Sequence, residues 1–177
     1  MESHFTVIAI TSPEETEGEA LRIAQILRDG EADIVHIRKP EWNEDMTADL
    51  LGQIPPEFYP RIKIHDHFSL LERFPLMGVH LNARNGTPPK NSRSVSRSLH
   101  CIEQLPLAEH YDYVTLSPIF DSISKAGYKS HFSLKELEPL LKGRRVIALG
   151  GVTPDKFPAL KEAGFAGAAM LGHFWLK

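Results

Sequence analysis

Residues 145–155 read Arg-Val-Ile-Ala-Leu-Gly-Gly-Val-Thr-Pro-Asp, and this stretch decides the fold. Its β-branched and apolar run predicts a buried strand, which ends abruptly at Gly150 and Gly151. The Thr-Pro-Asp that follows begins a segment with helical spacing. Two glycines at the end of a strand leave bare backbone N–H groups and no Cβ to keep a ligand away. We therefore expect a phosphate group to bind here.

Seven further runs predict strands, and segments with helical spacing lie between most of them. This alternation is typical of βαβ units, and eight strands favour a closed (β/α)₈ TIM barrel over an open α/β sheet, the alternative. In such a barrel the glycines follow strand seven, where phosphates often bind. The fourth helix is reduced, because residues 82–92 read as a loop, and the last is missing or truncated. The other predicted strands are 5–10, 33–38, 61–65, 78–81, 96–100, 113–116 and 166–171.

Length and composition indicate one domain over residues 1–177. The hydrophobic content of 42% is ordinary for a globular protein, and a net charge of −3 gives no basic footprint for nucleic acid. The single cysteine, Cys101, excludes an internal disulfide and fits a reducing cytoplasm. No apolar run is long enough to span a membrane, so we expect a cytoplasmic protein. A barrel without its last helix would favour self-association into a homo-oligomer.

The second predicted strand carries a cation toward the barrel interior. With the period of two of a strand, His36 and Arg38 point the same way, while Ile37 points oppositely. A cation on an inner face is costly unless it is paired, so Arg38 should meet an anion. That anion is either a ligand or an internal partner such as Asp66 or Glu31.

Seven pieces of the sequence, in this order, resemble the thiamine phosphate synthase family, which includes a thiazole tautomerase branch. The resemblance covers nearly the whole chain. The pieces are HIRKP (36–40), HD (65–66), GVHL (78–81), SRSLH (96–100), SPIFDSISK (117–125), VIALGGVTPD (146–155) and AGFAGAAMLG (163–172).

The resemblance implies an enzyme that couples hydroxymethylpyrimidine diphosphate to thiazole phosphate and releases pyrophosphate. Its site residues transfer to this chain by motif. Arg38, Lys125 and His36 would be catalytic, with Lys39 an imperfect substitute for a family lysine that falls on Pro40. The substrates and their phosphates would contact His65, Ser98, His100, Ser122, Ser124, Gly150, Gly151, Leu171 and Gly172.

The resemblance also implies Mg²⁺, held by Asp66. The second metal aspartate of the family falls on Asn85, which leaves one negative charge fewer for the cation. His65 and His67 offer two imidazoles, but two histidines without a third ligand are weak evidence for a transition metal.

Two other functions stay open at this point. A thiazole tautomerase would isomerise a carboxythiazole phosphate by proton transfer, but Pro118 stands where that branch has its acid/base histidine. His36, His65 or His100 would then have to move the proton, since imidazole titrates near neutral pH. The third reading is a non-catalytic barrel that binds thiazole or thiamine phosphate.

Overall fold

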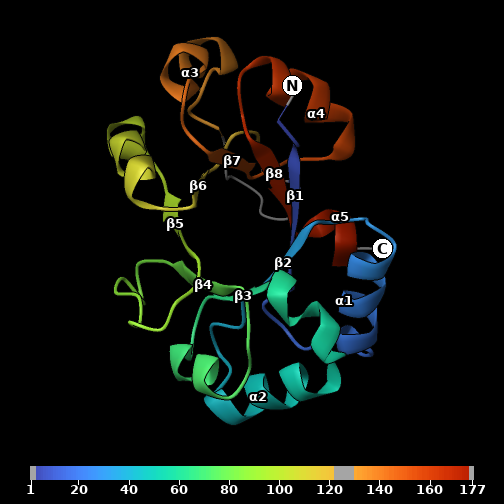
Figure 1. The fold of residues 1–177 in the computed structure, drawn as a ribbon. Coiled ribbons are helices and arrows are strands. Elements are labelled where there is room, and N and C mark those ends of the chain that lie inside the picture. The colour runs from blue at the N-terminus through green and yellow to red at the C-terminus, as the bar shows by residue number, and fades with distance from the viewer. Residues whose placement is uncertain (1–2, 122–129, 176–177) are drawn as a thin grey trace.

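The computed structural model describes residues 3–121 and 130–175, and these form a closed barrel of eight parallel strands. Neighbours in sequence pair throughout, and β8 closes on β1 through the partners Thr6–Gly167 to Ala9–Met170. Figure 1 shows the ring of strands, with the helices outside it. The strands are β1 Thr6–Ile10, β2 Ile34–Ile37, β3 Ile62–Ile64, β4 Gly78–Leu81, β5 Val95–Leu99, β6 Tyr113–Leu116, β7 Val146–Leu149 and β8 Gly167–Met170.

The predicted (β/α)₈ barrel is therefore confirmed, and the open sheet is not. Residues 82–92 carry no helix between β4 and β5, as expected, and the last helix is a single turn. The α-helices are α1 Glu19–Arg28, α2 Glu44–Gln53, α3 Leu134–Leu141, α4 Phe157–Glu162 and α5 Gly172–Trp175. The 3₁₀ segments are η1 Pro56–Arg61, η2 Phe68–Glu72, η3 Ile102–His110 and η4 Pro154–Lys156.

The sequence pattern predicts helices over residues 48–54 and 101–108, and the structure differs at both. The second helix begins at Glu44 rather than at Ala48, because the Asn43 side chain accepts a hydrogen bond from Met46 N at 2.9 Å and caps the first turn. The segment after β5 is 3₁₀ rather than α-helical, and it contains Pro106, which has no N–H to donate to an α-helical bond. Neither change moves a strand.

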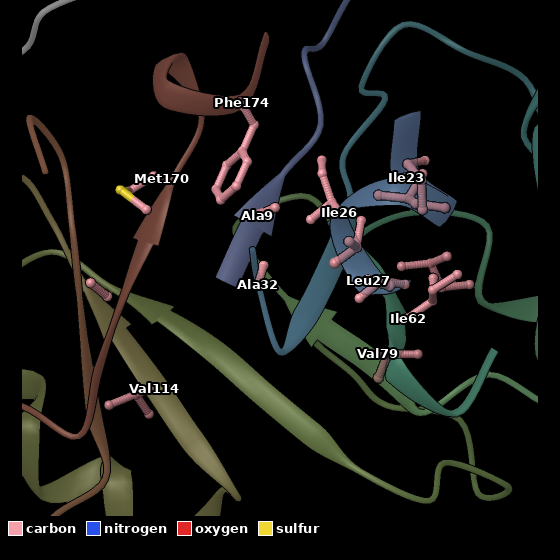
Figure 2. Packing of buried hydrophobic residues seen from close by; sticks show 14 of the residues in the cluster. Ala9, Ile23, Ile26, Leu27, Ala32, Ile62, Val79, Val114, Met170 and Phe174 are labelled. Atoms are coloured by element: carbon pink, nitrogen blue, oxygen red, sulfur yellow. The ribbon is translucent and has the colours of Figure 1, made fainter. Parts of the chain in front are cut away.

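Hydrophobic packing forms two separate cores on the two sides of the barrel wall. The outer core fills the space between strands and helices, where Ile23, Ile26 and Leu27 of α1 pack with Ala9 of β1. Phe174 points from α5 toward β1 (Figure 2), and Trp175 Nε1 donates to the Ile10 carbonyl oxygen at 2.6 Å. The short last helix thus covers the β1–β8 seam. The smaller core lies inside the barrel and consists of Ile8, Ile10, Ile34, Tyr113, Ile147 and Ala169.

The two glycines after β7 have a structural reason that does not involve a ligand. A Cβ on Gly150 would lie 2.7 Å from Pro118 Cα, and one on Gly151 would lie 2.2 Å from the Asp121 carbonyl oxygen. Gly151 also has a left-handed backbone, with a φ of 61°. The glycines therefore let the loop after β6 pack against the end of β7. None of the described helices is long and apolar enough to cross a membrane.

We predict that Gly151→Ala lowers the free energy of unfolding by about 1–3 kcal/mol, since the methyl group meets backbone and the left-handed φ is strained. Gly52→Ala is the matched control, because it lies inside α2 with open space around its Cα. That change should be neutral or stabilising by up to about 1 kcal/mol. Urea unfolding measures both, and an unchanged stability of Gly151→Ala would contradict the packing described here.

Candidate functional site

The barrel interior is divided into an apolar and a polar half. Strands β1, β7 and β8 contribute Ile8, Ile10, Ile147 and Ala169 to the apolar half. Strands β2 to β6 contribute the polar half, whose side chains are almost entirely buried and contact one another. Burial of so many polar groups is tolerated only if they bond to one another. The polar members are His36, Lys63, His65, His80, Ser96, Tyr113 and Thr115, of which Thr115 Oγ1 is buried without a hydrogen-bond partner among the described residues.

Four side chains from β3, β4 and β5 form a continuous chain of hydrogen bonds. Lys63 Nζ donates to Ser96 Oγ at 3.0 Å, and Ser96 Oγ lies 2.8 Å from His80 Nδ1. The other ring nitrogen, His80 Nε2, lies 2.8 Å from Ser98 Oγ. Because Ser96 accepts from Lys63, its hydroxyl can donate to His80, which leaves Nε2–H to donate to Ser98. The chain thus runs from the middle of the barrel to Ser98, near the carboxyl end of β5.

A second branch joins two histidines to a tyrosine. His36 Nδ1 lies 2.9 Å from His65 Nε2, and His36 Nε2 lies 2.6 Å from the Tyr113 hydroxyl. The Tyr113 ring also faces Lys63 Nζ at 4.4 Å from its centroid. His36 is therefore held within the barrel by protein partners at both ring nitrogens.

Burial favours the uncharged forms of these groups. It lowers the pKa of His80 to about 3 and that of Lys63 to about 7, and it raises the pKa of Tyr113. Burial also lowers the pKa values of His36 and His65 well below the ordinary range, with a smaller contribution from neighbouring positive charge. A neutral amine and neutral imidazoles can pass protons along a hydrogen-bonded chain, so the network has the means for acid–base chemistry.

The three imidazoles of His36, His65 and His80 could also offer nitrogen ligands to a metal, since their ligand atoms lie within 4.8 Å of one another. Both nitrogens of His36 and both of His80 already have protein partners, however. A metal would have to break those bonds and sit close to Lys63. We therefore interpret the cluster as a hydrogen-bond network.

At the carboxyl ends of β2, β3 and β4, Arg84 and Asn85 bind one carboxylate and Arg38 lies nearby. Arg84 Nη2 lies 3.1 and 3.3 Å from the two oxygens of Asp66, and Arg84 Nε lies 3.3 Å from Oδ1. Asn85 Nδ2 donates to the same Oδ1 at 2.8 Å. Burial lowers the pKa of the half-buried Arg38. The nearby charge of Arg84 lowers this pKa further, and the charge of Asp66 raises it. The charge of Arg38 thus acts on Asp66 from nearby, and the anion that Arg38 binds stays a prediction.

This arrangement does not fit a divalent cation well. Asp66 and Asn85 do lie together, as the motif implies, but they offer one carboxylate and one amide, and the amide nitrogen faces the carboxylate. Both carboxylate oxygens are bound by Arg84. Magnesium favours a carboxylate or two together with substrate phosphates. Magnesium binding at Asp66 stays a prediction, and the donor set does not favour it.

The remaining predicted site residues that the structure describes lie at the same end of the barrel, and all but one are at least partly exposed. Gly150, Gly151, Leu171 and Gly172 follow β7 and β8 and are partly exposed. His100 directly follows β5 and is exposed, and its Nδ1 lies 3.3 Å from Ser117 Oγ. Lys39 is the exception, because its ammonium is buried against Glu19 at 2.8 Å and the Glu14 carbonyl oxygen at 2.6 Å. Ser122, Ser124 and Lys125 lie outside the described residues.

Sequence reasoning missed Lys63, His80, Ser96, Tyr113 and Arg84. The signal that could have found three of them is the strand period of two: Lys63 precedes His65 by two residues, Ser96 precedes Ser98, and His80 is the inward residue of GVHL. Arg84 lies in a loop, where no periodicity indicates direction.

The fold and these residues together define the class: a (β/α)₈ barrel with a buried polar network inside it and with Arg38, Asp66 and Arg84 at the carboxyl ends of its strands. In this class, functional groups gather at that end. A family model described as thiamine monophosphate synthase matches residues 7–174. The chain therefore belongs to the thiamine monophosphate synthase family, which confirms the resemblance.

Individual relatives agree with this family. The chain is 36% identical to a thiamine phosphate pyrophosphorylase from Bacteroides thetaiotaomicron, with a TM-score of 0.83, over 97% of this chain and 85% of that one. It is 42% identical to the thiamine-phosphate synthase of Levilactobacillus brevis over 62 residues, 34% of this chain and 29% of the relative. It is 30% identical to that of Synechococcus sp. over 135 residues, 71% of this chain. The matches span only 29%, 58% and 38% of three curated relatives.

We predict that Lys63 makes the stability of the barrel depend on pH. Its pKa is about 7 in the folded protein and about 10.4 in an unfolded chain. Between these values the unfolded chain binds more protons, so the free energy of unfolding rises with pH, by up to about 1.4 kcal/mol per pH unit. Lys63→Met should lose this rise between pH 7 and pH 10, whereas exposed Lys161→Met should keep it. Urea unfolding at several pH values checks this, and equal slopes for Lys63→Met and the wild type would contradict it.

Proposed function

We propose that the protein couples hydroxymethylpyrimidine diphosphate to thiazole phosphate to give thiamine phosphate and pyrophosphate. The observation that carries the proposal is the similarity to the Bacteroides pyrophosphorylase, which extends over 97% of this chain and includes the whole barrel. The positions that the family motifs assign to substrate lie mostly at one end of this barrel, where barrel enzymes bind their ligands.

In this reaction the bond between the pyrimidine methylene carbon and the diphosphate oxygen breaks, and the thiazole nitrogen forms a new bond to that carbon. The protein must hold the departing anion and place the two rings against each other. Arg38 supplies a half-buried cation for the diphosphate. The backbone after β7 and β8, at Gly151 and Gly172, is proposed to hold the thiazole phosphate, with Leu171 against the ring. No covalent nucleophile is needed.

Purified protein supplied with both substrates should form thiamine phosphate and an equal amount of pyrophosphate, measured by chromatography and a pyrophosphate assay. We predict that Arg38→Met lowers kcat/KM at least about tenfold, the effect expected for one lost charge-assisted hydrogen bond. Arg97→Met is the matched control. Arg97 occupies a position of β5 that faces away from the barrel interior, and its guanidinium contacts the Tyr111 hydroxyl. Absence of thiamine phosphate with and without magnesium would exclude the proposal.

A second function, thiazole tautomerase-like isomerisation, is favoured by one observation: the chain Lys63–Ser96–His80–Ser98. Tautomerisation removes a proton from one atom of the carboxythiazole and returns it to another, and this chain could exchange that proton at Ser98 Oγ. It would replace the histidine that the tautomerase branch has at the position of Pro118.

This second function predicts that the protein aromatises carboxythiazole phosphate and that His80→Gln lowers the rate about 100-fold or more, since an amide cannot relay a proton as imidazole does. Glutamine keeps a donor and an acceptor, so the fold should persist, as thermal unfolding would verify. His110→Gln serves as a control on an exposed histidine. If His80→Gln retains full tautomerase activity, the relay is not used.

A further inference from the structure

We propose that Arg84 replaces a divalent cation in this protein, and that Arg38 and Arg84 together bind the diphosphate of the substrate without metal. The inference deepens the proposed function and rests on it for the identity of the natural ligand. Its structural basis is independent, because it concerns how the chain's own charges are arranged around Asp66.

Both oxygens of the Asp66 carboxylate already accept hydrogen bonds from protein groups. Arg84 contacts both oxygens of Asp66 at 3.1 and 3.3 Å, and Asn85 adds a bond of 2.8 Å to Oδ1. The Asp66 side chain is only 13% exposed, so solvent competes weakly for it, whereas the Arg84 side chain is 44% exposed. One end of the guanidinium is therefore fixed on Asp66, and an exposed part remains to donate to a ligand.

The side chains around Asp66 carry a net positive charge. Arg38 and Arg84 carry two positive charges and Asp66 carries one negative charge, so this group of three already attracts an anion. Magnesium would add two further positive charges beside two guanidiniums, with a single carboxylate to offset them. With the neutral Asn85 as its neighbour, Asp66 provides too little negative charge for that cation. A guanidinium also matches phosphate geometry with paired N–H donors.

Four hydrogen bonds of the Asn82 and Asn85 side chains hold the loop around Arg84 in place. Asn82 Oδ1 accepts from the backbone N–H groups of Arg84 and Asn85, at 2.9 and 3.1 Å. The side chains of Asn82 and Asn85 both donate to the His65 carbonyl oxygen at the end of β3, at 2.9 and 3.1 Å. The two asparagines thus fix the loop to the strand that carries Asp66, which positions the guanidinium before a ligand arrives.

Calorimetry with inorganic pyrophosphate tests the proposal on the intact protein. In EDTA the wild type should bind pyrophosphate, and Arg84→Met should bind it at least about tenfold more weakly. The control Arg97→Met should bind as the wild type does. The double variant Arg84→Ala/Asn85→Asp presents two carboxylates without the guanidinium, and its pyrophosphate binding should require magnesium.

Two results would overturn the proposal: wild-type binding that is lost in EDTA and restored by magnesium, or an Arg84→Met variant that binds as tightly as the wild type. Thermal unfolding of each variant shows whether it is folded. The proposed coupling reaction can fail separately, because pyrophosphate binding in EDTA without formation of thiamine phosphate would retain the arginine site and exclude the synthase.

Discussion

Most strands of this barrel are buried on both faces, and that constraint determines the rest of the structure. Alternate residues must pack either against helices or into the interior, so Ala9 joins the outer core while Ile8 and Ile10 join the inner one. The same alternation brings His36, Lys63 and His80 into the interior. Polar groups placed there have no water to bond, and they are stable only because neighbouring strands supply partners at matching depth.

The lysine in the middle of the barrel shows that protein partners only partly replace the hydration lost on burial. Lys63 has no carboxylate partner within the hydrogen bonds described for it, only Ser96 Oγ and the face of the Tyr113 ring. Neither partner fully offsets the loss of hydration of an ammonium, so the amine gives up its proton near neutral pH. Loss of that charge allows the interior to stay closed, and it also makes a basic amine available at the inner end of the chain to Ser98.

The sequence was sufficient for the barrel and for the loop in place of the fourth helix, because both depend on local periodicity and on turn residues. It also placed His36 and Ile37 correctly on opposite faces of β2, since only the strand period was needed. It could not give the pair Lys63–Ser96 or His36–Tyr113. Those contacts join residues 33 and 77 positions apart, and they depend on the stagger between strands, which no local pattern encodes. The partner of Lys39 was missed for the same reason, because Glu19 lies on a different element.

The end of the barrel where the predicted site residues gather shows why a motif alone does not determine a cofactor. Asp66 is in the position that the family resemblance gives to a metal ligand, yet the meaning of a carboxylate depends on its neighbours. Two carboxylates and a dication sum to zero charge, and so do one carboxylate and one guanidinium. If Arg84 takes the place of the cation, as proposed above, Asn85 in place of the second acid leaves the local charge unchanged. Asn85 and Arg84 are adjacent in the chain, and Asn82 holds both backbone N–H groups, so the two changes act as one unit. Under the proposal above, such a unit would bind the anion at this end of the barrel without an ion.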